Sequence, residues 1–434
     1  MLQKIKNLFW HLPKSIFFNI RYGYPSKKLI LIGVTGTDGK TTTCTLIHHI
    51  LEQAGIKAGV ITTIGAKISN NKEMSTGLHM TSPDSSLVQK ILKEMLNAGV
   101  THVVCEITAH ALDQYRYHGC RFKVSALTNT SHEHLDYYQN MESYIQSKAK
   151  LFQQSETSIL NKDDDSYRII SKLTANPVLT YSINNKSDFQ AKNIKIDSDF
   201  LQFTVNDLKI KSNSPYRYQI YNILAAFGVC SCLHVDQKVF QNAVLNFPET
   251  KGRREEVSND FKIKTIIDFA HTPAAIKNTL ESLKQNTSGN LIIIFGATGG
   301  RDKSKRPDMG KEATTFANIT ILTSDDTRNE KVEEINKQIA SGINSKKVSY
   351  VDYKNITTPN HFSKLHSESK NNPVYLSIEN RQDAFNFAVK LAKTGDTIIA
   401  CGKGHETTIL HGSTEYPWSE AEAFRTAFRF KKNK

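Results

Sequence analysis

The stretch LILIGVTGTDGKTTT, residues 29–43, decides the fold of this chain. Its apolar beginning predicts a buried strand that ends at Gly33, and residues 44–53 place apolar side chains on one face of a helix. A glycine-rich turn lies between the two. Gly36 and Gly39 allow backbone N–H groups to turn toward an anion at the helix N-terminus. The stretch therefore predicts a phosphate-binding loop at the head of an α/β sheet.

Two side chains of this loop supply the chemistry that a nucleotide needs. Lys40 can reach the β- and γ-phosphates, and Thr41 can hold Mg2+. Val34 stands where the common loop has a glycine, so this loop is a variant. The alternative is a glycine-rich turn with a chance lysine and threonine, and the predicted strand before it and helix after it argue against that alternative.

The composition limits the class of protein. The chain has 434 residues, 39% of them hydrophobic, which suffices for two or three domains with ordinary cores. The formal net charge of +14 favours a polyanionic partner, which could be a nucleotide, nucleic acid or an anionic membrane surface. Nucleic acid rests on charge alone, because no base-reading module is recognisable. The six cysteines show neither metal-ligand spacing nor a small-domain disulfide framework, which favours a reducing cytosol.

Residues 1–28 combine basic and apolar side chains and contain no acid. Their apolar runs are too short and too interrupted for a secretory signal or for a membrane span, which needs about 20 apolar residues. Such a segment either lies on an anionic membrane surface or packs on the body of the protein with its lysines solvated. Both alternatives stay open. Pro13 and Pro25 are expected to break the segment into short pieces.

After the loop, the chain continues as alternating strands and helices. Residues 58–64 form a strand-like run, residues 70–73 indicate a turn or loop, and the helical pattern within residues 79–99 is expected to be capped by Ser82 or Thr81. A further strand, residues 102–106, ends on a carboxylate. An acid at the C-terminal end of a strand beside a phosphate loop lies where ligands of doubly wound sheets gather.

Long motifs resemble the Mur ligases, the ATP-dependent enzymes that add amino acids to the peptidoglycan precursor, and within them the MurE type. EITAHALDQYR, residues 106–116, is similar to EVSSHALDQxR, and residues 128–152 are similar to TNLSRDHLDYHGxMExYxxAKxxLF. The loop TGTDGKTTT resembles the nucleotide loop of the same family. By this resemblance ATP contacts the loop residues Gly36, Thr37, Asp38, Gly39, Lys40, Thr41 and Thr42.

The resemblance also implies a magnesium site and a substrate site. Glu106 and His134 correspond to Mg2+ ligands, with Thr41 on the ion that bridges the nucleotide phosphates. Lys148 takes the place of a lysine that family members carbamylate for a second Mg2+. The implied catalytic set consists of Lys40, Glu106, His134 and Lys148. Positions that bind the muramoyl peptide in the family are occupied by Thr81, Ser82, Thr108, Gln114 and Arg116.

Three departures from the family pattern stand close to these residues: His132 replaces arginine, Glu133 replaces aspartate and Ala109 replaces serine. Oxygen ligands with one imidazole suit a partly hydrated Mg2+ that phosphate completes. On its own, Lys148 would be interpreted as a solvated helix lysine. Further along, the helix in residues 214–230 resembles one in which Asn222 contacts adenine, although Gln219 replaces the first asparagine of that motif.

The C-terminal half repeats the alternation of strands and helices, which predicts a second α/β domain. FPETKGRREEV, residues 247–257, resembles the hinge that opens the family's C-terminal domain. Residues 268–276 match DYAHTPxxL, which implies that Asp268 and His271 face ATP. Residues 295–310 match FGCGGDRDxxKRPxMG, which offers three cations to phosphate or substrate. They are Arg301, Lys305 and Arg306.

Two stretches correspond to the family's amino-acid site. TSDDTRNE, residues 323–330, lines up with the DNPR motif of ligases for meso-diaminopimelate, and Arg328 offers a fork that can pair with the distal carboxylate. Asp325 belongs to this site, while Asp326 and Thr327 replace asparagine and proline of the motif. CGKGHE, residues 401–406, matches GKGHE. By that match two residues contact the amino acid, Gly402 and Glu406.

The sequence thus predicts an α/β protein with a P-loop central domain, residues 29–247, that has a mostly parallel sheet, and a Rossmann-like C-terminal domain, residues 248–434, preceded by the basic segment 1–28. The resemblance covers residues 29–425. It implies an amide ligase that uses ATP and Mg2+ to add a diamino acid, meso-diaminopimelate, to UDP-MurNAc-L-Ala-D-Glu through an acyl phosphate. We also expect the protein to be cytoplasmic and monomeric.

Alternatives to this function stay open. MurE ligases carry an N-terminal domain for the UDP end of the substrate, and only the basic segment precedes the loop here, so we expect weaker or different UDP binding or a lipid-linked muramoyl peptide. Within the ligase class, folylpolyglutamate and cyanophycin-type synthetases are the rivals. From another class comes a non-catalytic nucleotide-binding partner.

Overall fold

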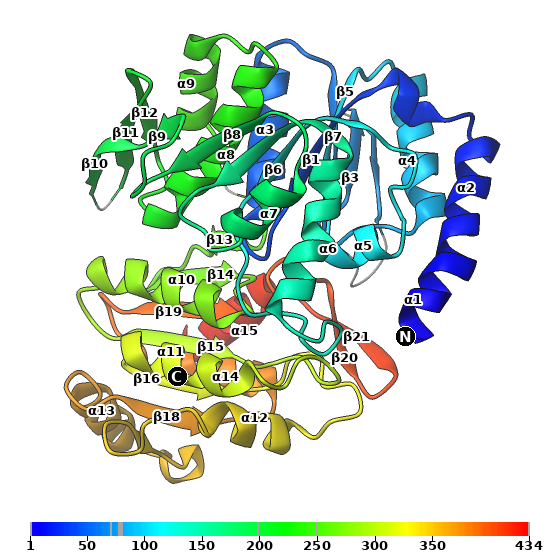
Figure 1. The fold of residues 1–434 in the computed structure, drawn as a ribbon. Coiled ribbons are helices and arrows are strands. Elements are labelled where there is room, and N and C mark those ends of the chain that lie inside the picture. Colours follow the sequence, from blue (N-terminus) through cyan, green and yellow to red (C-terminus); the bar gives the residue numbers. More distant parts are fainter. Residues whose placement is uncertain (1, 70–71, 77–80, 198, 249, 433–434) are drawn as a thin grey trace. The chain divides into compact units, whose positions relative to one another are not determined.

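The computed structural model describes residues 2–69, 72–76, 81–197, 199–248 and 250–432. These residues divide into two compact units. The first comprises Met1–Ser131 with Tyr138–Pro248, and the second comprises His132–Tyr137 with Glu249–Lys434. Each unit is an α/β body with its own sheet, and each is described by itself (Figure 1).

The first unit is built on a nine-stranded sheet in the order β4-β3-β2-β5-β1-β6-β7-β8-β9. The predicted strand of the phosphate-loop motif is β1 (Ile30–Thr35), which pairs in parallel with β5 (His102–Glu106) and β6 (Phe122–Leu127). The remaining strands are β2 (Ala58–Ile61), β3 (Ala66–Ser69), β4 (Lys72–Met74), β7 (Ser155–Asn161), β8 (Val178–Ser182) and β9 (Phe189–Gln190). Only β3 and β4 are antiparallel additions, so the prediction of a mostly parallel sheet is confirmed. The turn expected within residues 70–73 begins outside the described residues.

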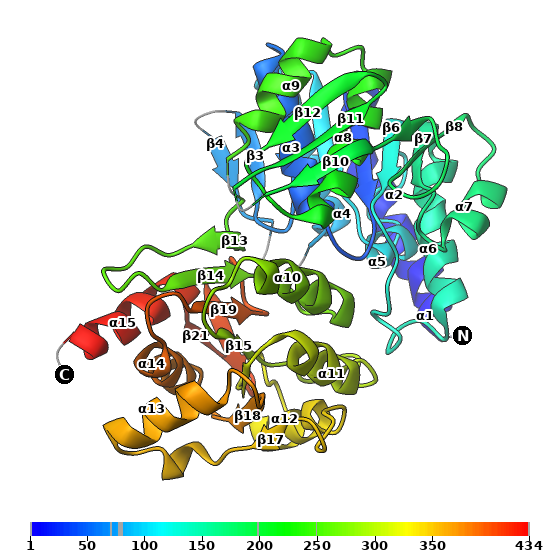
Figure 2. The same cartoon turned by 90° about the vertical axis from the view of Figure 1, so that its left-hand side faces the viewer.

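Both faces of this sheet are covered by helices, which explains why β1 is apolar at successive positions. Ile32 and Val34 point into one core with α3 (Lys40–Gln53) and α8 (Arg217–Cys232), while Leu31 points into the other with α4 (Ser85–Asn97). The other elements of this unit are α5 (Ala109–Asp113), α6 (Met141–Gln153), α7 (Tyr167–Leu173), α9 (Gln237–Leu245), β10 (Lys192–Ile196), β11 (Leu201–Val205) and β12 (Leu208–Ser212). The small sheet β10-β11-β12 lies against α9 (Figure 2).

Two expectations about helix ends are wrong. The N-cap of α4 is Asp84, whose carboxylate accepts the N–H of Ser86, and neither Ser82 nor Thr81 caps this helix. Near the N-terminus, helical residues run on through Pro13: α1 (Leu2–Lys6) passes into a π turn, Asn7–His11, and then into α2 (Leu12–Arg21). Proline is tolerated in the first turn of a helix segment, which is its position in α2. No described helix is both long and apolar enough to cross a membrane.

The second unit confirms the predicted second α/β domain fold. Its seven-stranded sheet has the order β13-β14-β19-β15-β16-β18-β17, and only β13 is antiparallel to its neighbour. The strands are β13 (Arg253–Glu256), β14 (Lys264–Asp268), β15 (Leu291–Phe295), β16 (Ile319–Leu322), β17 (Ser349–Tyr350), β18 (Val374–Ser377) and β19 (Thr397–Cys401). A separate hairpin is formed by β20 (Thr408–His411) and β21 (Thr414–Pro417).

Helices cover both faces of the second sheet as well. Alternate residues of β15 divide between two cores: Ile292 and Ile294 lie with α14 (Arg381–Leu391) and α15 (Glu420–Lys432), and Ile293 lies with α10 (Pro273–Gln285). The remaining helices are α11 (Arg306–Phe316), α12 (Val332–Ala340) and α13 (Pro359–Glu368). The C-terminal ends of its parallel strands carry the loops after β14, β15, β16 and β19, where the predicted ATP and amino-acid residues lie.

Candidate active site

The glycine-rich turn joins β1 to α3, and two of its positions require glycine. Gly39 precedes α3 with a φ of 80°, and a Cβ there would lie 2.5 Å from Asn222 Oδ1. A Cβ on Gly36 would overlap the Thr128 hydroxyl. Because neither glycine has a side chain, the N-terminal N–H groups of α3 are not covered by a Cβ, as a phosphate site requires.

Side chains that follow β6 fix the shape of this turn. Thr128 Oγ1 donates to the Asp38 carbonyl over 2.7 Å, and the Asp38 N–H donates to Asn129 Oδ1 over 2.9 Å. Lys40 Nζ donates to the Thr37 carbonyl over 2.7 Å. The loop is therefore pre-shaped, and its lysine ammonium lies on the loop itself, where phosphates would bind.

Glu106 brings a carboxylate to the start of α3. It is 1% exposed at the end of β5, and both its oxygens lie 3.0 Å from Thr41 Oγ1. Thr63, which the sequence analysis did not single out, donates to the same carboxylate from its N–H (2.9 Å) and its hydroxyl (3.0 Å). The signal for Thr63 was its place just after β2, at the same edge of the sheet.

These residues fit a divalent cation of the Mg2+ kind. A hydroxyl and a carboxylate are hard oxygen donors, and they lie at the loop that would hold the phosphates. Within the described parts of the chain there is no group of three or more histidine, cysteine, aspartate or glutamate side chains that could hold a metal alone. Water and phosphate oxygens would therefore have to complete the coordination.

Lys148 lies on α6 beside the same loop. Its side chain is completely buried, Nζ donates to the Gly36 carbonyl over 2.7 Å, and it lies 4.1 Å from the centre of the Tyr144 ring. The neighbouring Lys150 instead forms an exposed ion pair with Asp113. A buried lysine is rare unless it has a specific partner, so the alternative of a solvated helix lysine is wrong for Lys148.

Four of the five predicted peptide-binding residues are connected by hydrogen bonds. Ser82 Oγ accepts the N–H of Thr108 over 3.1 Å, and the Arg116 guanidinium donates to the Ser82 carbonyl. Arg116 also donates to Gln114 Oε1 through two nitrogens, at 3.0 and 2.7 Å. Thr81, the fifth, precedes Ser82 and is partly exposed. The cluster presents hydroxyl, amide and guanidinium groups, which suit a polar, acidic peptide.

Asn222 lies on α8 and contacts the helix that follows the phosphate loop. Its Oδ1 accepts a hydrogen bond from Thr43 Oγ1 (3.4 Å), and its Nδ2 donates to Gln219 Oε1 (2.8 Å). Gln219, which replaces an asparagine of the family motif, thus holds the Asn222 amide. The buried character expected for residues 224–229 is confirmed.

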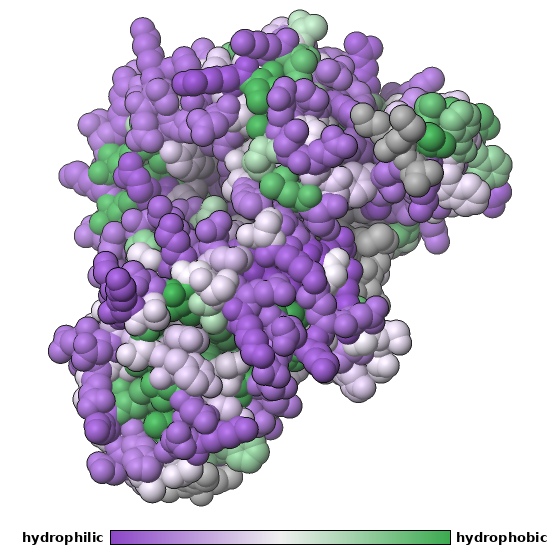
Figure 3. All heavy atoms as spheres, turned by 60° about the horizontal axis from the view of Figure 1, so that its bottom comes forward, coloured by the Kyte–Doolittle hydropathy of each residue, from purple (hydrophilic) through white to green (hydrophobic). Residues whose placement is uncertain are grey.

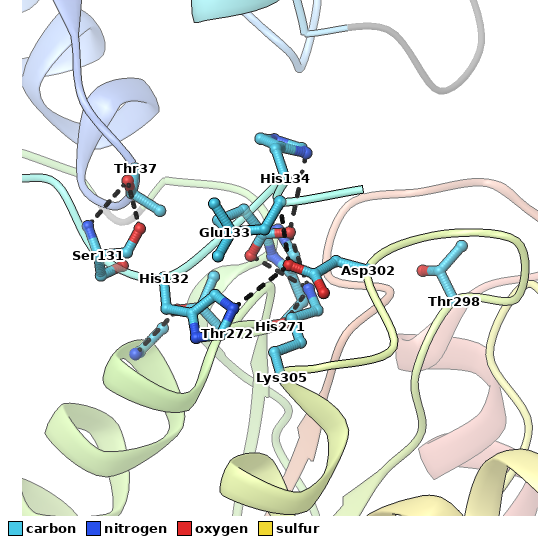
Figure 4. Close-up of polar contacts among 12 residues, drawn as sticks. Thr37, Ser131, His132, Glu133, His134, His271, Thr272, Thr298, Asp302 and Lys305 are labelled. Atoms are coloured by element: carbon cyan, nitrogen blue, oxygen red, sulfur yellow. Dashed lines mark hydrogen bonds and ion pairs between the residues drawn. The ribbon is translucent and has the colours of Figure 1, made fainter. Parts of the chain in front are cut away.

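The segment His132–Tyr137 belongs to the second unit, although it lies between β6 and α6 in sequence. Glu133 and Lys305, both buried, form an ion pair at 2.8 Å (Figure 4). His132 donates or accepts at Ser304 Oγ (3.0 Å) and lies 3.6 Å from Asp302. His134, the predicted metal ligand, is in this segment and so is not brought together with Thr41 and Glu106 within one unit.

The residues of the second unit that are predicted to face ATP lie in different electrostatic environments. Burial raises the pKa of Asp268, which accepts the N–H of Ala270 over 2.8 Å. His271 bonds through Nδ1 to the Phe269 carbonyl (2.9 Å). Part of the Arg301 side chain is exposed to solvent, but desolvation of its guanidinium, together with the neighbouring Arg328 cation, lowers its pKa. The two neighbouring cations create a positive local potential, which favours the binding of an anion.

Lys305 and Arg306 do not offer free cations. Lys305 is buried in an ion pair with Glu133, and its ammonium also donates to the His271 carbonyl over 2.8 Å. Arg306 is fully buried and pairs with Glu330 at 2.8 Å and with Gln338 at 2.7 Å. Acids of the same unit already pair with both cations, and the expectation that they bind phosphate or substrate stays a prediction.

The predicted amino-acid residues lie on the loops after β16 and β19. Lys403 is fully buried between Asp326 (2.7 Å) and Glu406 (2.5 Å). Burial acts to lower the pKa of Lys403, but the acids around it, Asp325 first, raise it overall. Asp326 is one of the departures from the motif, and its partner Lys403 explains why a carboxylate is accommodated there. Gly402 has no room for a Cβ, which would lie 2.5 Å from Asp325 Oδ2.

Arg328 adopts a left-handed backbone, with a φ of 50°, and forms an isolated bridge with His411 of β20. Its Nε is buried without a hydrogen-bond partner among the described residues. The neighbouring Thr327 shares a hydrogen bond of 3.0 Å with His411 Nδ1. The hairpin β20–β21, which the sequence analysis missed, thus positions this arginine. Its signal was the alternation around Gly412.

One buried residue joins the two loops. Arg381 of α14 donates to the Ser324 carbonyl after β16 (2.8 Å) and to the Cys401 carbonyl at the end of β19 (2.9 Å). Its guanidinium also pairs with the buried Glu420 of α15. Burial acts to lower the pKa of Arg381, and Glu420 raises it overall. Arg381 therefore holds the loops that carry Asp325 and Gly402.

A phosphate loop with a carboxylate and a hydroxyl at the start of its helix is typical of proteins that bind a nucleotide with a divalent cation. Two family models identify the chain further: the Mur ligase middle domain matches residues 34–230, and the Mur ligase glutamate ligase domain matches residues 252–404. The chain belongs to the Mur ligase family of ATP-dependent amide ligases.

Individual proteins agree with this assignment. The chain is 31% identical over 428 residues to the UDP-N-acetylmuramoyl-L-alanyl-D-glutamate–2,6-diaminopimelate ligase of Geobacillus thermodenitrificans, covering 96% of this chain and 82% of that protein. A solved structure of a ligase of the same name has 25% identity and a TM-score of 0.62, covering 96% and 82%. Mycobacterium tuberculosis folylpolyglutamate synthase, at 14% identity and a TM-score of 0.70 over 96% and 95%, shares the fold.

Proposed function

We propose that this chain is an ATP-dependent ligase that joins meso-diaminopimelate to UDP-MurNAc-L-Ala-D-Glu. The observation that carries this proposal is the similarity, at 31% identity across 96% of the chain, to a relative named for this reaction. Arg328 and the paired acids of the second unit agree with a substrate that has two amino groups and two carboxylates. The central domain, residues 29–247, would bind ATP, and residues 248–434 would bind the amino acid.

At the nucleotide site, the P-loop residues would hold ATP and Lys40 would stabilise charge that develops on the transferred phosphate. Thr41 and Glu106 would hold Mg2+, which when bound neutralises phosphate charge. His134 is proposed as a further ligand, and Lys148 as a carbamate. Its burial beside Gly36 agrees with a specific role at the loop rather than a solvated one.

The reaction proceeds in two transfers. A carboxylate oxygen of the peptide attacks the γ-phosphorus of ATP, the bond to the bridging oxygen breaks, and an acyl phosphate and ADP result. The amine of the amino acid then attacks the acyl carbon, loses a proton and expels inorganic phosphate. Ser82, Thr108, Gln114 and Arg116 would orient the peptide, so that most of the catalysis is positioning.

At the amino-acid site, Arg328 would bind the distal carboxylate of meso-diaminopimelate with its bidentate fork, helped by the cation of Arg301. Glu406 and Asp325 would face the ammonium. Lysine lacks the distal carboxylate and would leave Arg328 uncompensated. This difference predicts a preference for meso-diaminopimelate.

The test is phosphate release from ATP with UDP-MurNAc-L-Ala-D-Glu and either meso-diaminopimelate, L-lysine or no amino acid. We expect release with meso-diaminopimelate alone, and its loss in Arg328→Met but not in the control Arg429→Met, whose side chain is 70% exposed. Release with lysine at the same rate would refute the role of Arg328. Silence with every amino acid, or turnover of a pterin glutamate, would refute the proposed function.

We also propose that the enzyme works as a monomer in the cytoplasm. All six cysteines are free, as a reducing compartment would have them. The peptide acceptor is proposed to be UDP-linked, as the name of the relative states for that protein.

A further inference from the structure

The N-terminal helical segment, residues 2–21, packs a polar face on the first unit. Asn7, Ser15 and Asn19 are its buried residues. Ser15 Oγ donates to the Tyr115 carbonyl over 2.6 Å, and Asn19 Nδ2 donates to the His118 carbonyl over 2.8 Å. This helix is therefore held by hydrogen bonds, where a surface helix of a globular protein would usually bury its apolar stripe.

Most of the described apolar side chains of the same segment face outward. Seven large hydrophobic residues, which we call the N-terminal apolar face, are 40–73% exposed: Ile5, Leu8, Phe9, Trp10, Ile16, Phe17 and Ile20. Figure 3 shows hydrophobic side chains gathered at the right-hand edge, the side on which α2 lies in Figure 1. Exposed apolar patches of this kind mark interaction sites, because water contact with them is unfavourable.

The π turn Asn7–His11 contributes to this segregation. Each α-helical residue advances by about 100°, so the eight residues from Asn7 to Ser15 would turn Ser15 about 80° away from Asn7 in a regular helix. A π turn contains one residue more than an α turn and so compensates for most of this rotation. Asn7, Ser15 and Asn19 consequently share the buried face, and the apolar residues on either side of the turn share the exposed one.

The positive charge of residues 1–28 indicates that the partner of the N-terminal apolar face is anionic. Residues 1–28 carry six lysines and arginines and no acid. Lys6, Arg21, Lys27 and Lys28 are exposed, while Lys14 is paired with Asp84 at 3.0 Å. Apolar side chains with cations around them complement the acyl boundary and the phosphates of an anionic bilayer. A symmetric contact with a second copy would instead bring like charges together.

We propose that the N-terminal apolar face docks the protein on an anionic lipid bilayer, with the helical segment lying in the headgroup region. Phe9, Trp10 and Phe17 enter the acyl boundary, and the exposed cations contact lipid phosphates. The hydrogen bonds of Ser15 and Asn19 fix this face to the first unit, so docking also fixes which side of that unit faces the membrane. The inference does not depend on the proposed ligase reaction.

The experiment is co-sedimentation of the full chain with vesicles of phosphatidylglycerol and phosphatidylcholine, compared with vesicles of phosphatidylcholine alone. We expect binding to the anionic vesicles and at least tenfold weaker binding to the neutral ones. The triple variant Phe9→Ser/Trp10→Ser/Phe17→Ser should lose at least tenfold in partitioning. Its side chains are exposed, so folding should persist. Tyr350→Ser, at another exposed aromatic residue, is the matched control and should bind as the parent does.

Trp10 gives a second readout. Its emission should shift to the blue on anionic vesicles, and Trp10→Phe, which keeps only Trp418, should abolish the shift. Absence of binding to anionic vesicles would overturn the proposal, and so would equal binding of the triple variant. If the triple variant instead removes a concentration-dependent dimer seen by sedimentation velocity while vesicles bind neither protein, the face belongs to a second copy and the proposal is wrong.

Discussion

Replacing Arg381 by methionine should unfold the second unit at lower denaturant concentration. Methionine fills a similar apolar volume but removes the cation that pairs with Glu420, whose side chain has no exposed surface. Removing one partner of a buried ion pair costs about 3–5 kcal/mol, because the remaining charge stays buried without compensation. The carbonyls of Ser324 and Cys401 also lose their donor.

A second substitution separates the charge from the hydrogen bonds. In Arg381→Met/Glu420→Gln no unpaired charge remains, and the cost reduces to the orphaned carbonyls, about 1–3 kcal/mol together. Glu420→Gln should therefore restore about 2 kcal/mol when it is added to Arg381→Met, although it destabilises the parent. The effect of Glu420→Gln on the free energy of unfolding thus has opposite signs in the two backgrounds, as a direct interaction between the two side chains requires.

The assay is equilibrium unfolding in guanidinium followed by tryptophan fluorescence. The chain has two tryptophans, so a Trp10→Phe background leaves Trp418, which donates to Glu420 over 3.3 Å, as the reporter of the second unit. A loss below about 1 kcal/mol for Arg381→Met, against the 3–5 kcal/mol expected of a buried pair, would refute the reasoning. Additive losses in the double variant would refute it as well.

Three further predictions concern the loop, the metal site and pH. Lys40→Met should lower the rate of phosphate release by about 100-fold or more without changing the circular dichroism spectrum, since the ammonium acts on charge and not on packing. Glu106→Gln should raise the Mg2+ concentration for half-maximal activity by about tenfold or more, measured by magnesium titration, because Thr41 loses its anionic neighbour. Hydrogen bonds from Arg306 lower the pKa of Glu330 from 4.5 to about 2, so the ion pair stabilises the fold fully above pH 4.5 and loses this effect as the pH falls toward 2. Glu330→Gln should therefore cost about 2 kcal/mol in unfolding free energy at pH 6 and progressively less below pH 4.5, and an equal cost at both would contradict the linkage.

Much of the fold follows from local patterns. The strand, glycine turn and helix of residues 29–53 were predictable because apolar periodicity and glycine placement are properties of adjacent residues. The same holds for the alternation in the second unit. Pro13 was misjudged, because a π turn before it changes the consequence of a proline, and the cap of α4 was misplaced because Thr81, Ser82 and Asp84 are all competent cap residues.

The site was harder to predict from the sequence, because burial and ion pairing depend on residues that are distant in the chain. Lys148, Lys305 and Arg306 are all cations on helices or turns, and their sequence neighbourhoods do not reveal which of them is neutralised. Only the fold brings Glu133 to Lys305 and Glu330 to Arg306. The roles of the nucleotide, peptide and amino-acid residues come from resemblance and stay predictions for the experiments above.

The membership of His132–Tyr137 in the second unit has a consequence for synthesis. Glu133 leaves the ribosome while most of the second unit is still untranslated, and Lys305 emerges only much later. The first unit can thus be complete in sequence while a short piece of its chain still awaits its partners. A fragment that starts after residue 248 would lack that piece and would leave Lys305 without the carboxylate of Glu133, so the second unit should be difficult to express alone.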